Sequence, residues 1–247
     1  MTASTSTVSK TATTEHGHLD RVYVWEWPVR LAHWLFVGSI LVLAVTGIYI
    51  GNPFFAAKGE ATRHFVMGTI KSVHFVAAMV FLVAVFGRIL WMFAGNPYAR
   101  WNQLLPVSRK RLLGIWDTFR FYAFLKKDSP AFVGHNPLAG MVYTVVFCLF
   151  LMMIGTGVAM ISASAHVDSW FRGFDFLIGW FGGLQMARFL HHVGMWLILG
   201  FAAHHVWSAF LVGSVERSAL IDSIFSGYKV LTPDVAKRAE KHIEEDR

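Results

Sequence analysis

Residues Met186 to Val212 read MARFLHHVGMWLILGFAAHHVWSAFLV, an apolar segment that carries four histidines. At about 1.5 Å of rise per residue, a helix of this length spans roughly 40 Å, more than the roughly 30 Å hydrocarbon core of a bilayer. We expect it to cross a membrane completely. Side chains that ionise or bind metals are costly at membrane depth, so the histidines indicate a functional site.

The spacing of these histidines separates them into two sets. His191 and His205 are 14 residues apart, which at about 100° per residue leaves them about 40° apart around the helix and about 21 Å apart along its axis. His192 and His204 each lie about 100° from a neighbouring histidine and therefore point elsewhere. One face of the predicted helix thus presents two imidazoles at opposite membrane depths.

The composition indicates a membrane protein with several spans, because 55% of the 247 residues are hydrophobic and only 15% are charged. The fold class predicted is an all-α membrane protein, a bundle of four transmembrane helices with an added amphipathic cytoplasmic segment at Leu112–Leu125. A short helix or re-entrant segment is expected on the outer side within Ser162–Gln185. The four spans are predicted at residues 31–50, 70–95, 138–161 and 186–212.

The spans leave a tail at each end of a single membrane domain. Residues 1–22 are rich in serine and threonine and are predicted to be a disordered tail, residues 23–230 form the membrane domain, and residues 231–247 form a charged tail.

The lysine and arginine residues are unevenly distributed between the two sides of the predicted spans. Sixteen of the 22 lie on the side of the two termini and five on the other side. The positive-inside rule therefore places both termini in the cytoplasm. The net charge of +7 is explained by this asymmetry and by contact with anionic lipid, and it requires no nucleic acid.

Two further histidines match the depths of the first pair. The span at 31–50 starts on the cytoplasmic side, so His33 lies at inner depth, and the span at 70–95 starts outside, so His74 lies at outer depth. Because their membrane depths match, we expect His74 to pair with His191 and His33 to pair with His205. A lone histidine in a membrane is often a hydrogen-bonding residue between helices, but four at matching depth and phase favour the axial ligation of two haem irons. With both axial positions filled, electron transfer is the expected task.

Other residues can be assigned to this arrangement. Gly47 gives a haem of the outer pair room beside the backbone, although glycines in membrane helices also serve helix packing. Arg88 and Arg188 are candidate partners of haem propionates. His135, in GHNPLAG at the cytoplasmic membrane surface, is a candidate quinone or proton-relay residue. The single cysteine, Cys148, excludes a thiolate-based metal site and covalent haem attachment through a CxxCH motif.

The chain resembles the cytochrome b subunit of membrane-bound nickel-iron uptake hydrogenases. The resemblance covers about residues 22 to 230, and an ordered set of motifs carries it: YVWEWPVRLAHW at Tyr23–Trp34, GEATRHFVMGTIKSVHF at Gly59–Phe75, GRILWMFAGNPYAR at Gly87–Arg100, GHNPLA at Gly134–Ala139, HHVGMWLI at His191–Ile198 and SGYK at Ser226–Lys229.

The resemblance implies partners and a substrate. A large subunit with the nickel-iron site and a small iron-sulfur subunit would pass electrons to two b haems, held by His33, His74, His191 and His205, and on to the quinone pool. The chain would anchor this respiratory complex in the membrane and would have no H2-activating site of its own, with quinone reduction as its possible chemistry. The alternatives are the haem b subunit of another quinone-linked dehydrogenase, such as formate dehydrogenase, and a haem-free membrane anchor.

Overall fold

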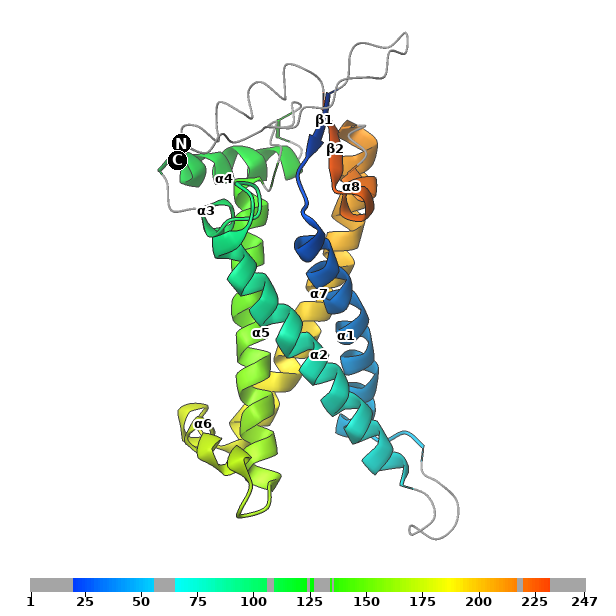
Figure 1. Cartoon of the computed structure of the whole chain (residues 1–247), viewed down its shortest axis with the longest axis vertical. Helices are drawn as coiled ribbons and strands as arrows, with labels where there is room; N and C mark the ends of the chain where they lie inside the picture. Colours follow the sequence, from blue (N-terminus) through cyan, green and yellow to red (C-terminus); the bar gives the residue numbers. More distant parts are fainter. Residues whose placement is uncertain are drawn as a thin grey trace. The chain divides into compact units, whose positions relative to one another are not determined.

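The computed structural model describes residues 20–55, 65–105, 109–123, 125–126, 134, 136–216 and 220–231 (Figure 1). Four of its helices are long and apolar enough to cross a membrane: α1 (Trp27–Gly51), α2 (Val66–Ala94), α5 (Pro137–Ser164) and α7 (Leu184–Glu216). The remaining elements of the described chain are short: β1 (Asp20–Tyr23), α3 (Trp101–Leu104), α4 (Arg109–Tyr122), η1 (Trp170–Phe174), α6 (Phe176–Trp180), α8 (Leu220–Ser226) and β2 (Tyr228–Leu231).

The four long helices confirm the predicted fold class, an all-α membrane protein with four spans. Most of their ends lie beyond the predicted apolar runs, because a helix continues through polar and interfacial residues that a hydropathy pattern leaves out. At its first residue α5 has Pro137, whose fixed φ suits this position. Asn136 caps this helix, since its Oδ1 accepts a hydrogen bond from the Ala139 amide at 2.7 Å.

The outward faces of the long helices are themselves apolar. Leu41 and Val45 on α1 are 65% and 62% exposed, and Val83 on α2 is 65% exposed. A soluble protein rarely leaves such a continuous apolar surface in water. The exposed side chains suit the hydrocarbon of a bilayer, where helices satisfy their own backbone hydrogen bonds.

The chain divides into two compact units. One unit comprises the described parts of Met1–Leu31, Ile89–Thr144 and His205–Arg247. The other comprises the described parts of Ala32–Arg88 and Val145–His204, and it contains a long stretch of each of the four apolar helices.

In the first unit, β1 pairs antiparallel with β2, from Asp20 opposite Leu231 to Tyr23 opposite Tyr228. β1 includes residues 20–22 and β2 includes residue 231, all of which the sequence analysis placed in the two tails. The sequence did not indicate these strands, because a strand of four residues has no recognisable pattern when its partner is far away in the sequence. Residues 1–19 and 232–247 of the predicted tails lie outside the described residues.

A hydrogen-bonded connection extends this sheet toward the helices of the same unit. The Gly227 carbonyl accepts from the Val24 amide at 2.9 Å and from the Trp25 amide at 3.1 Å. Glu26 Oε2 accepts from Trp91 Nε1 and from the Asn96 amide, both at 2.8 Å. The start of α1 is thereby fixed to the end of α2 and to the segment after α8.

The predicted amphipathic segment forms α4 in this unit, and its helix ends at Tyr122. Leu113 and Trp116 are more than three-fifths exposed, whereas Arg111 and Thr118 are buried. Arg111 donates to Gln103 Oε1 and to the Gln103 carbonyl, both at 2.7 Å. The buried face of α4 is thus engaged with its own unit, and contact of the exposed face with the membrane surface stays a prediction.

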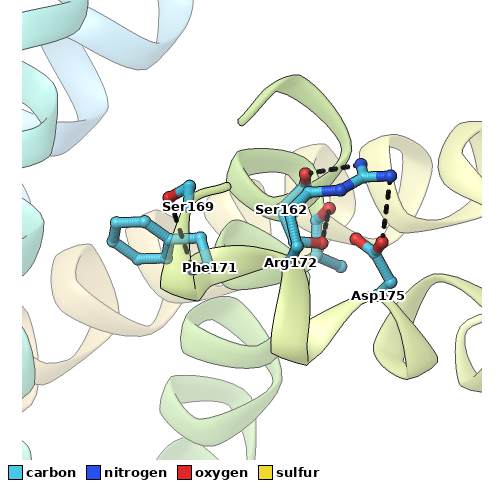
Figure 2. A network of polar contacts seen from close by, with 6 residues as sticks. Ser162, Ser169, Phe171, Arg172 and Asp175 are labelled. Carbon is cyan, nitrogen blue, oxygen red and sulfur yellow. Dashed lines mark hydrogen bonds and ion pairs between the residues drawn. The ribbon is translucent and has the colours of Figure 1, made fainter. Parts of the chain in front are cut away.

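In the second unit, the segment between α5 and α7 folds into η1 and α6, which confirms the expected short helix. Arg172 holds it in place: its guanidinium donates to the Ser162 carbonyl at 3.2 Å and pairs with Asp175 at 3.2 Å (Figure 2). Ser169 caps η1 by accepting from the Phe171 amide at 3.4 Å (Figure 2). This segment packs on the end of α5, close to the helices that carry the candidate site.

Candidate functional site

Two of the predicted histidines face each other in the second unit. His74 extends from α2 and His191 from α7, and their ring centroids lie 6.5 Å apart with an angle of 55° between the ring planes. Both side chains are half-buried. The structure thus brings together the pair that helix depth and phase predicted for the outer side of the membrane.

A threonine hydroxyl contacts the Nδ1 atom of His74. Thr46 Oγ1, on α1, lies 2.8 Å from this nitrogen and 2.6 Å from the Val42 carbonyl, to which it donates. A hydroxyl has only one proton to donate, and that of Thr46 is donated to the Val42 carbonyl. The hydroxyl oxygen of Thr46 therefore accepts a hydrogen bond from the imidazole N–H. The proton of neutral His74 is therefore assigned to Nδ1, and Nε2 keeps a free lone pair.

The same arrangement recurs at His191. Thr156 Oγ1, on α5, lies 2.8 Å from His191 Nδ1 and donates to the Met152 carbonyl at 2.8 Å. Nε2 of His191 is likewise left as the atom with the lone pair. All four long helices thus contribute to one site, two with a histidine and two with a threonine.

The geometry of the two rings fits axial ligation of one metal ion. Metal–imidazole bonds are about 2 Å long and the ring centre lies about 1 Å beyond the nitrogen, so two opposed imidazoles have centres about 6 Å apart. The observed separation agrees with this value. No cluster of three or more histidine, cysteine, aspartate or glutamate side chains suited to a metal occurs in the described part of the chain. Two imidazoles alone suit a metal that brings its own equatorial ligands, as iron does in haem.

Glycines lie beside both rings. A Cβ atom placed on Gly47 would lie 3.5 Å from His74 Cε1, and one placed on Gly157 would lie 3.6 Å from His191 Cε1. A side chain longer than that of alanine at either position would meet the imidazole or the space next to it. The structure therefore places Gly47 at the outer histidine pair, where the sequence analysis expected it.

The other two predicted ligands belong to different units. His205, in the first unit, has the Tyr143 hydroxyl 3.3 Å from its Nδ1, and the two rings meet edge to face at 5.9 Å. His33, in the second unit, lies edge-on against Trp34 with ring centroids 5.2 Å apart. The pairing of His33 with His205 stays a prediction from helix periodicity.

The two arginines predicted to contact haem propionates differ in their exposure to solvent. Arg88 is buried in α2, as expected for a charge with a specific partner. Arg188 is exposed and donates to Gln185 Oε1 at 3.1 Å, while its carbonyl lies 3.0 Å from His192 Nδ1. His135 lies outside the described residues.

Sequence reasoning missed Thr46, Thr156 and Tyr143. A threonine in a membrane helix commonly bonds the carbonyl one turn earlier, and both threonines do so. Their second contact, with a histidine on another helix, cannot be recognised from the sequence pattern. Only their helical phase relative to a known ligand of a neighbouring span could have suggested it.

Comparison with known proteins agrees with this architecture. Residues 24–227 match the family described as "Prokaryotic cytochrome b561". The chain is 38% identical over 219 residues to a probable Ni/Fe-hydrogenase B-type cytochrome subunit of Azotobacter vinelandii, covering 86% of this chain and 90% of the relative. It is 40% identical over 214 residues to the similarly named protein of Cupriavidus necator, covering 85% and 88% of the two chains. It is also 40% identical over 212 residues to the probable Ni/Fe-hydrogenase 1 B-type cytochrome subunit of Escherichia coli K12, covering 84% and 90%.

The match extends across all four long apolar helices and across every histidine of the candidate site. The chain is therefore a multi-pass membrane protein that belongs to the prokaryotic cytochrome b561 family.

Proposed function

We propose that this chain is the b-type cytochrome subunit of a membrane-bound nickel-iron hydrogenase, and that it carries electrons from the hydrogenase through haem b to quinone. The observation that carries the proposal is the outer site, where His74 and His191 each have Nδ1 engaged by a threonine and Nε2 free. The relatives supply the link to a hydrogenase, because each is named as a cytochrome subunit of one.

In the outer site, His74 and His191 would hold one haem b. When bound, the haem supplies a centre that takes up and gives back one electron. The chain would position it with two neutral imidazoles from α2 and α7, and Gly47 would leave room at the ring edge. A haem held by histidines from both α2 and α7 would be suited to electron transfer rather than to the binding of a substrate.

His33 and His205 would hold a second haem at inner depth. Haems at two depths would carry electrons across the bilayer, from the outer to the cytoplasmic side. Arg88 and Arg188 would pair with haem propionates, Arg88 from within the membrane segment and Arg188 from an exposed position near His191. His135 would serve quinone reduction near the inner haem.

The partners would be the small iron-sulfur subunit and the large nickel-iron subunit of the hydrogenase. H2 oxidation would take place in the large subunit, because a nickel-iron centre requires several cysteine ligands and this chain has one cysteine. The chain would anchor the complex in the bacterial inner membrane with both termini in the cytoplasm.

A haem count on ligand variants tests this function. The protein is purified in detergent, and haem is measured by the pyridine haemochrome method and by a reduced-minus-oxidised spectrum. Two b haems per chain are expected, with one lost in His74→Ala and one in His33→Ala. His192→Ala is the matched control, because it removes the exposed histidine next to His191 and should keep both haems.

The same preparation distinguishes the competing functions. Nickel that co-purifies with the complex supports the hydrogenase partner, whereas molybdenum or tungsten would indicate another dehydrogenase. A well-folded wild-type protein without haem would overturn the electron-transfer function and leave a membrane anchor.

A further inference from the structure

We propose that Thr46 and Thr156 are positioning residues that fix the Nδ1–H tautomers of His74 and His191 and lower the reduction potential of the haem these histidines hold. This inference rests on the proposed function, since it assumes that the outer site binds haem. It adds a role for two residues outside the ligand set.

The first step is the direction of the hydrogen bonds. Each threonine hydroxyl lies within 2.8 Å of the carbonyl four residues earlier on its own helix, Val42 for Thr46 and Met152 for Thr156. A carbonyl can only accept, so the hydroxyl proton is used there and the hydroxyl oxygen accepts from the histidine. Thr46 is 9% exposed and Thr156 is fully buried, so water does not compete for these bonds.

The second step is the effect on the ligand. A hydrogen bond accepted from Nδ1–H draws the proton away from the ring and makes Nε2 a stronger electron donor to the iron. A stronger donor stabilises the ferric state relative to the ferrous state and lowers the reduction potential. Because the site lies in a medium of low dielectric constant, each hydrogen bond has a larger effect than it would in water.

The test is a redox titration of the purified complex with Thr46→Val, Thr156→Val and the double variant. Valine has nearly the shape of threonine and lacks the hydroxyl. The midpoint of one haem should move upward in each single variant and most in the double variant, while the other haem keeps its wild-type midpoint. Thr46→Ser, which restores a hydroxyl, should return the midpoint toward the wild-type value.

Thr144→Val is the matched control. Thr144 lies on α5, like Thr156, and its hydroxyl also bonds the carbonyl four residues earlier, but its other partner is the Leu104 carbonyl rather than a histidine. This variant should leave both midpoints unchanged.

Two results would overturn the proposal: unchanged midpoints in valine variants that retain haem, or a serine variant that behaves like the valine variant. If a valine variant loses its haem, Thr46→Cys is measured in its place, because a thiol of similar size is a weaker acceptor, and an unmoved midpoint there overturns the proposal equally. A wild-type outer site without haem would instead refute the proposed function itself.

Discussion

The hydroxyl of Tyr143 lies 3.3 Å from His205 Nδ1, so a phenol contacts this histidine, whereas threonine hydroxyls contact His74 and His191. Tyr143→Phe keeps the ring that packs edge to face on His205 and removes only the hydroxyl. Both haems should be retained, and the midpoint of one should shift, because a hydrogen bond to an axial ligand affects its basicity. Redox titration of the complex measures this, and unchanged midpoints for both haems would contradict it.

Gly47 lies where a larger side chain would occupy the space beside His74. Gly47→Leu should remove one of the two haems, since even a Cβ atom at this position would lie 3.5 Å from the His74 ring and 3.8 Å from Met195 Sδ. The pyridine haemochrome count measures the loss. Gly38→Leu on the same helix is the control, because a Cβ atom at Gly38 has no atom within 4 Å, and this variant should keep both haems. Equal haem loss in the two variants would contradict a specific role of Gly47 in leaving space for a haem.

The bond from Trp91 to Glu26 should be measurable in the stability of the protein. Trp91→Phe removes the indole donor 2.8 Å from Glu26 Oε2 and leaves that carboxylate with the Asn96 amide. Loss of a hydrogen bond to a charged group typically costs about 1.5–3 kcal/mol, so the thermal midpoint in detergent should fall. Trp116→Phe, at an exposed position on α4, should have little effect. A drop of the same size in both variants would argue against a specific role of the Glu26 bond.

Gly227 has a backbone conformation that suits glycine, with φ at 87°. Alanine in such a left-handed conformation costs roughly 1–2 kcal/mol. Its Cβ would also lie 2.6 Å from the Tyr23 ring and 2.7 Å from the Trp25 carbonyl. Gly227→Ala should therefore separate β1 from β2 and expose both strands to limited proteolysis. Gly87→Ala, at an open position of α2, should be as resistant as the wild type, and intact strands in Gly227→Ala would disprove the prediction.

Two kinds of feature could be predicted from the sequence: apolar runs long enough to cross a bilayer, and polar side chains whose burial in a membrane costs free energy. Four spans could be predicted because each apolar run is at least as long as a helix needs to be to cross a bilayer. His74 and His191 could be matched because a costly side chain in a membrane helix has both a depth and a phase, and the structure places their rings 6.5 Å apart.

The features that the sequence did not reveal depend on single contacts between distant residues. Asp20–Tyr23 becomes a strand only because Tyr228–Leu231 pairs with it, and neither stretch of four residues shows a period of its own. Thr46 and Thr156 resemble ordinary threonines of membrane helices until the neighbouring helices are in place.

The β1–β2 sheet also sets an order of events during synthesis. β1 leaves the ribosome before any of the four membrane helices, and β2 leaves after all of them. β1 therefore stays unpaired while all four spans are inserted, because β2 has not yet been translated. A chain that stops early cannot form this sheet, so truncated products keep an open strand edge that a protease can recognise.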